Sequence, residues 1–93
     1  MIRASTISIP AILKLQSREE CYQFFEDLCT VSEIKSMSQR IAVAKMLSDK
    51  RVYTDIVAKT GASTATISRV NRSLAYGCDA YKMIFARMNE DEQ

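Results

Sequence analysis

Histidine is absent from this sequence of 93 residues, and cysteine, proline and glycine are scarce. The three cysteines, Cys21, Cys29 and Cys78, are odd in number and show no Cys-x-x-Cys spacing, so neither a zinc site nor a disulfide framework is indicated. They are better explained as small buried residues in a reducing compartment. Without histidine, a metal-ligand cluster or a glycine-rich phosphate loop, no catalytic or metal-binding residue is expected, and only a cysteine nucleophile keeps the enzyme alternative open.

Long apolar runs are also missing. The most apolar N-terminal stretch, Ile7 to Leu15, is short and is interrupted by Pro10 and Lys14, so it predicts no signal peptide. No run approaches the length needed to span a membrane, and we expect a cytoplasmic protein. One proline, two glycines and no alternating β-branched run together predict an all-α fold.

The length and the hydrophobic content point to a dimer. A chain of 93 residues makes one domain, and a domain this small buries only roughly 60% of its unfolded surface. Yet 47% of its residues are hydrophobic. The excess predicts a partner surface, most simply a second copy of the chain.

Charge is unevenly distributed, although the net charge is only +2. Residues 35–72 contain eight basic and two acidic side chains, whereas residues 17–34 contain one basic and five acidic ones. A basic half of this kind favours contact with nucleic acid, and an acidic half keeps the orientation of docking unambiguous. Chance clustering on solvated helix faces is the alternative explanation.

Helix boundaries can be placed from capping signals. Ser17–Glu20 and Thr30–Glu33 are capping boxes, and the helices after them carry apolar residues at helical spacing. A short helix from Pro10 to Leu15 comes first, and Asp79 is expected to cap the last helix. Within one domain, residues 1–93, the predicted parts are a dimerisation region (10–48), a helix–turn–helix unit (53–76), a C-terminal packing helix (79–88) and mobile ends (1–8 and 89–93).

The helix–turn–helix prediction rests on the stretch Tyr53 to Leu74. Thr54 is expected to cap its first helix, Gly61 supplies the positive φ of the turn, and Ser63 caps the second helix. Ile67, Val70 and Leu74 recur at i, i+3 and i+7 and form the inner side of that second helix.

The outer side of the second helix carries hydroxyls, a methyl group and arginines, and no acidic residue lies between Gly61 and Leu74. Small side chains allow a helix to enter the major groove, and hydroxyl and guanidinium groups donate to base edges and phosphates. The expected DNA-binding residues are Lys59, Ser63, Thr64, Ala65, Thr66, Ser68, Arg69 and Arg72. The alternative is an ordinary helical hairpin with a polar face, in a helical dimer that binds a protein or a small molecule.

Three segments of the chain resemble the tryptophan-repressor superfamily, and in particular its YerC/YecD-like branch. They are Cys21–Thr30, Ser38–Leu47 and Thr60–Arg72, of which Gly61–Arg72 is the specific part. The resemblance covers roughly residues 10–81. It implies an intertwined all-helical homodimer that presents two reading helices to palindromic DNA as a transcriptional regulator, commonly a repressor.

The resemblance also implies an effector site. Arg40 and Arg69 match the two arginines that enclose an indole ring in the tryptophan repressor, and Thr30 and Ser73 match its polar helpers. Val70 replaces the family's glycine, and its branched side chain is expected to fill space that the indole needs. No cofactor is therefore required, L-tryptophan is disfavoured as co-repressor, and another small molecule remains an alternative. A phosphate contact, or an ion pair with Asp49 or Asp55, would also account for the arginines.

Overall fold

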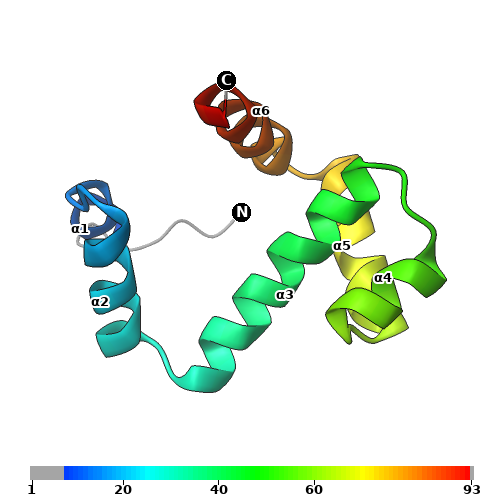
Figure 1. The fold of residues 1–93 in the computed structure, drawn as a ribbon, viewed down its shortest axis with the longest axis horizontal. Coiled ribbons are helices and arrows are strands. Elements are labelled where there is room, and N and C mark those ends of the chain that lie inside the picture. Colours follow the sequence, from blue (N-terminus) through cyan, green and yellow to red (C-terminus); the bar gives the residue numbers. More distant parts are fainter. Residues whose placement is uncertain (1–7, 93) are drawn as a thin grey trace. The chain divides into compact units, whose positions relative to one another are not determined.

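All the regular structure of this protein is helical in the computed structural model, which describes residues 8–92 (Figure 1). The helices are α1 (Ser8–Leu13), α2 (Arg18–Leu28), α3 (Val31–Ser48), α4 (Tyr53–Thr60), α5 (Thr64–Tyr76) and α6 (Ala80–Glu92). No strand occurs over the described range, which confirms the all-α prediction. Of the ends expected to be mobile, residues 1–7 and Gln93 lie outside the described residues, whereas Ser8 is helical. The chain divides into two compact units, residues 1–34 and 35–93.

Both capping boxes form in the N-terminal unit. The Glu20 N–H donates to Ser17 Oγ at 3.1 Å, and Glu20 Oε1 accepts from the N–H of Gln16, one residue before the cap, at 2.9 Å. At the start of α3 the pair is reciprocal: Thr30 N–H donates to Glu33 Oε1 at 2.8 Å, and Glu33 N–H donates to Thr30 Oγ1 at 3.1 Å. The backbone N–H of Thr30, followed by its hydroxyl, lowers the pKa of the Glu33 carboxyl below its ordinary 4.5.

The apolar stripe of α2 is only partly covered within this unit. Cys21, Phe24 and Phe25 are half-buried, and the two phenylalanine rings meet edge to face with centroids 5.6 Å apart. Leu28, the last member of the predicted stripe, is 60% exposed. Neither α1 nor α2 contains a fully buried residue. A single chain therefore leaves much of this apolar surface facing water.

The end of α3 is a Schellman motif without glycine. Lys50 has a φ of 65°, its N–H donates to the Leu47 carbonyl, and the Arg51 N–H donates to the Met46 carbonyl, both at 3.0 Å. These bonds satisfy carbonyls that the last turn of the helix leaves without partners. They also direct the chain from α3 into α4.

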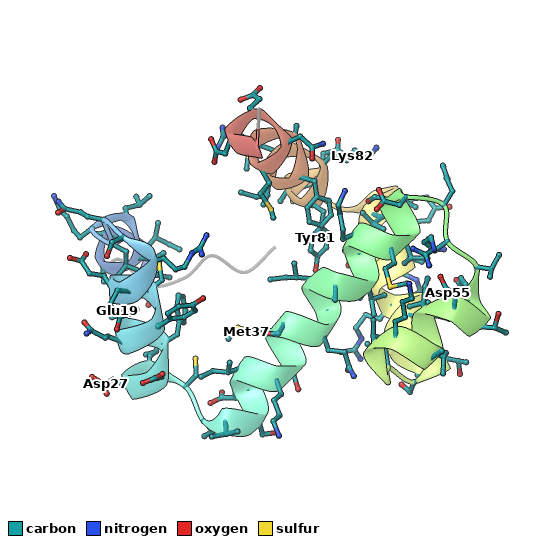
Figure 2. The ribbon with its side chains drawn as sticks, in the orientation of Figure 1. Glu19, Asp27, Met37, Asp55, Tyr81 and Lys82 are labelled. Atoms are coloured by element: carbon teal, nitrogen blue, oxygen red, sulfur yellow. The ribbon has the colours of Figure 1, made fainter. Side chains whose placement is uncertain are left out.

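Four helices and the turn after α4 contribute to the core of the C-terminal unit, whose helices α4 and α5 lie beside the C-terminal part of α3 (Figure 1). The buried residues are Val43 and Ala44 of α3, Ile56 of α4, Ala62 of the turn, Ile67 and Val70 of α5 and Phe85 of α6. This confirms the predicted inner side of α5. Ile41, in contrast, is 50% exposed, and Met37 projects from the side of α3 opposite to α4 and α5 (Figure 2).

Helix α6 is held to this core through two aromatic rings. Tyr81 and Phe85 stack with centroids 6.0 Å apart, and Lys45 Nζ lies 5.6 Å from the Phe85 centroid. Tyr81 lies on the side of α6 that faces α3 (Figure 2). The other two members of the predicted stripe, Ile84 and Met88, are 44% and 49% exposed. Half of the expected packing surface of α6 is thus uncovered in one chain.

The predicted Thr54 cap is wrong, whereas Asp79 takes the predicted position directly before α6 without the extended backbone of an ordinary cap. Helix α4 begins at Tyr53, before Thr54, and its cap residue Val52 makes no side-chain capping bond. The first turn is instead stabilised by Asp55, which pairs with Arg51 and suits the positive end of the helix. Asp79 directly precedes α6, but its φ of 61° is left-handed rather than extended, and its carboxylate lies 3.6 Å from Lys82 Nζ.

Two predicted helix ends and one burial prediction also need correction. Helix α1 stops at Leu13, because the N–H groups of Lys14 and Leu15 donate to carbonyls only three residues back. Helix α6 continues past residue 88 to Glu92, since exposed polar residues such as Glu90 favour a helix without being buried. Cys78 is exposed in the connection between α5 and α6, whereas Cys21 and Cys29 are half-buried. None of the described helices is both long and apolar enough to span a membrane.

Candidate nucleic-acid interface

The turn between α4 and α5 is built as the sequence predicts. Gly61 has a φ of +71° and its N–H donates to the Val57 carbonyl at 2.9 Å, which closes α4. The Ala62 N–H donates to Thr60 Oγ1 at 3.1 Å, and the Ala62 side chain is buried in the core. The turn is therefore anchored from both sides, and it orients the beginning of α5.

Ser63 caps α5. Its Oγ accepts from the Thr66 N–H and donates to Thr66 Oγ1, each at 3.1 Å. The remaining N–H groups of the first turn of α5 point away from the helix, and no acidic residue occupies that turn. A phosphate is the ligand that such a helix end favours. Contact of Ser63 and Thr66 with a phosphate stays a prediction.

The two sides of α5 differ in burial, as the spacing of its apolar residues predicts. Ile67 and Val70 are buried and Leu74 is half-buried. The predicted base-reading residues Thr64, Ala65 and Ser68 are exposed, and so are Arg69 and Arg72. Lys59 is exposed near the end of α4. The structure thus places most of the predicted DNA-binding set on accessible surface, with Thr66 half-buried at its edge.

Both carboxylates of residues 35–72 are paired, which leaves basic side chains in excess. Asp49 Oδ1 lies 3.2 Å from Lys45 Nζ, and Asp55 pairs with Arg51. Over residues 8–92, Arg40, Arg69 and Arg72 form no ion pair. The alternative explanation of Arg40 and Arg69 as ion-pair partners of these two aspartates is therefore wrong.

A pocket of about 230 Å³ lies between α3 and α5. It is lined by Ser36, Gln39, Arg40, Ala65, Thr66 and Arg69. It brings together the two arginines of the predicted effector site and contains no acidic lining residue. Ser36 and Gln39 carried no sequence signal, because only the folded arrangement sets them beside α5.

The other members of the predicted effector site are not among the residues that line this pocket. Ser73 lines a second pocket, of about 280 Å³, formed by the end of α5 and the beginning of α6. Thr30 belongs to the N-terminal unit, where its hydroxyl is engaged in the capping box of α3. Val70 lines neither pocket; its side chain is 2% exposed and lies in the core. Of the predicted effector residues, only Arg40 and Arg69 therefore line the pocket between α3 and α5.

An all-α protein with a capped helix–turn–helix unit is the class that these elements define. Residues 7–89 match the family model described as Trp repressor protein. The chain therefore belongs to the Trp repressor family. It is 56% identical over 82 residues to the protein YerC of Bacillus subtilis, a match that spans 88% of this chain and 79% of YerC.

Solved structures agree with this family and this fold. The crystal structure of a proposed Trp repressor from Staphylococcus aureus is 63% identical, with a TM-score of 0.85 and coverage of 87% of this chain and 81% of that one. The structure of a TrpR-like protein from Eubacterium eligens is 60% identical, with a TM-score of 0.85, and the match covers 87% and 84% of the two chains. The resemblance inferred from the three sequence segments is confirmed.

Proposed function

We propose that this protein is a sequence-specific DNA-binding regulator of transcription, a repressor that binds palindromic operators as a homodimer. The observation that carries this proposal is the division of α5: its inner residues Ile67 and Val70 are buried, while an acid-free side with Ser68 and Arg72 is exposed. A helix of this kind fits the major groove. The similarity to a proposed Trp repressor and to a TrpR-like protein supports the same function.

Each of the eight predicted DNA-binding residues has a role in this proposal. Thr64, Ala65 and Ser68 contact base edges, where hydroxyls donate or accept and a methyl group meets thymine. Phosphates are held by Lys59, Thr66, Arg69 and Arg72, together with the Ser63 backbone at the start of α5. Phosphate contacts set affinity, and base contacts set sequence preference.

The partner in the dimer is a second copy of the chain, joined through apolar side chains that one copy leaves exposed. On α1–α3 these include Leu13, Leu28, Val31 and Ile41, each at least 50% exposed. When the second copy covers these side chains, residues 1–93 form one domain of the dimer. Two-fold symmetry then sets the two reading helices about one helical turn of DNA apart, roughly 34 Å.

In-vitro selection of DNA by the purified protein tests the proposal. Random duplexes are selected at low and at physiological salt, with and without L-tryptophan. We expect enrichment of a palindrome whose half-sites are separated by about one helical turn. Absence of any enriched sequence at low salt would favour the non-DNA alternative, a helical dimer that binds a protein or a small molecule.

The pocket between α3 and α5 supports a second proposal, an effector site. Two arginines without carboxylate partners converge on it, so Arg40 and Arg69 would hold a small acidic molecule. The DNA backbone is the competing source of the same negative charge. Arg40→Ala separates the two: a phosphate contact lowers the salt slope of DNA binding by about one unit, whereas an effector contact leaves the slope unchanged. Calorimetric titration with L-tryptophan and with small organic acids then identifies the effector.

A further inference from the structure

One long-range hydrogen bond joins α3 to the helix–turn–helix unit. Gln39 Nε2 donates to the Thr60 carbonyl at 3.1 Å, a partly buried bond between residues 21 positions apart. Thr60 is the last residue of α4, so its carbonyl has no partner within the helix. Gln39 therefore supplies, from a different helix, the cap that this carbonyl needs.

Thr60 is also the residue that organises the turn. Its hydroxyl donates to the Ile56 carbonyl at 2.7 Å and accepts from the Ala62 N–H at 3.1 Å. Gly61 and Ser63, which set the direction of α5, follow at once. A displacement of Thr60 would accordingly move the start of the reading helix.

The buried contacts between α3 and this unit are apolar. Val43 and Ala44 lie in one core cluster with Ile56, Ile67 and Val70. Apolar contacts are non-directional, so they restrict the orientation of two packed helices less sharply than a hydrogen bond does. A hydrogen bond has strict distance and angle requirements, so it adds a directional constraint.

We propose that Gln39 is a positioning residue that sets the orientation of the helix–turn–helix unit on α3, and through it the separation of the two reading helices. This inference rests on the proposed function, in which both reading helices must meet half-sites on one duplex. Gln39 also lines the pocket between α3 and α5, but no contact with DNA is assigned to it in this scheme. Its effect is on which half-site spacing is accepted, rather than on which bases are read.

Gln39→Met tests this role, because methionine has a similar length and no N–H donor. Binding is measured to the selected palindrome and to versions with one base pair added to or removed from the spacer. We expect the preference for the native spacing to fall by roughly two- to tenfold, the range of one net hydrogen bond. Gln23→Met is the matched control, since Gln23 is an exposed glutamine on α2 whose side chain donates to Glu19, one turn away. It should keep the full preference.

A second measurement needs no DNA. Hydrogen exchange at the amides of Gly61 and Ala62 should accelerate in Gln39→Met and stay at the native rate in Gln23→Met. Faster exchange together with an unchanged spacing preference would overturn the positioning role, because Gln39 would then only stabilise the turn. If the exchange rates of these two amides are unchanged in Gln39→Met, the bond from Gln39 does not anchor the turn. If the native protein selects no DNA, the proposed function fails, and the exchange measurement still decides whether Gln39 holds the turn.

Discussion

Lys50 is the residue where local geometry and residue type disagree most clearly. It occupies the left-handed position of the Schellman motif with a φ of 65°, where glycine is favoured. Left-handed backbone costs a residue with a Cβ roughly 1–2 kcal/mol. Lys50→Gly should therefore raise the free energy of unfolding by about 1 kcal/mol in urea denaturation. Lys35→Gly, the same change at an exposed position inside α3, should lower it by about as much. A loss of stability in both variants would contradict the prediction.

Arg72 and Thr64 separate affinity from specificity. Both are exposed on α5, but in the proposed complex a guanidinium contacts phosphate and a short hydroxyl contacts a base edge. Arg72→Ala should weaken binding to all sequences alike and lower the salt slope by about one unit. Thr64→Ala should change the preferred sequence at one position of each half-site and leave the slope intact. Fluorescence anisotropy at several salt concentrations checks both, and an unaltered slope in Arg72→Ala would remove the phosphate assignment.

The start of α3 is an element whose stability should depend on pH. The capping box stabilises the ionised form of Glu33, so its pKa is lower in the folded protein than in the unfolded chain. The resulting stabilisation is complete above the ordinary pKa of 4.5 and is lost as the pH falls below it, through the lower folded value. Glu33→Gln should therefore abolish this part of the acid dependence, as followed by circular dichroism between pH 6 and pH 2. An unchanged acid profile would show that the box does not form in solution.

Helices and caps with strong local signals could be predicted from the sequence. The capping boxes at Ser17 and Thr30, the turn at Gly61 and the cap at Ser63 each depend on residues at most four positions apart. Thr54 is not the cap: α4 begins at Tyr53, and Asp55 of its first turn pairs with Arg51. Whether a cap or a charge pair forms at a helix start cannot be settled from residue types alone.

The part of the candidate site that lies on α5 could be predicted from the sequence, whereas the parts formed between α3 and other helices could not. The outer side of α5 follows from helical periodicity, so Ser68 and Arg72 could be assigned before the fold was known. The pocket between α3 and α5 and the bond from Gln39 to Thr60 need the tertiary arrangement, because no local pattern relates these positions. For the same reason the predicted effector set is divided: Arg40 and Arg69 line one pocket, whereas Ser73 lines another.

At the scale of the whole molecule, one chain leaves an apolar surface that the proposed dimer must cover. Ile41 is 50% exposed on α3, and nearby Met37 projects from the side opposite to the helix–turn–helix unit (Figure 2). Monomeric proteins rarely leave large contiguous apolar patches in water. If this surface is the dimer interface, a charge placed on it should be unpaired and poorly solvated in the dimer, and therefore costly.

Ile41→Lys should consequently turn the dimer into a folded monomer. Sedimentation equilibrium should give twice the chain mass for the native protein and the single chain mass for the variant, while circular dichroism retains the helical signal. Tyr76→Lys is the control, since Tyr76 is 86% exposed on α5 and lies outside the proposed interface. The monomer should also bind a half-site and its palindrome with similar affinity, because it no longer links two reading helices. If Ile41→Lys keeps the dimer mass, the subunits contact each other through a different surface. If the native protein has the mass of a single chain, it cannot bind a palindrome as a two-fold symmetric dimer.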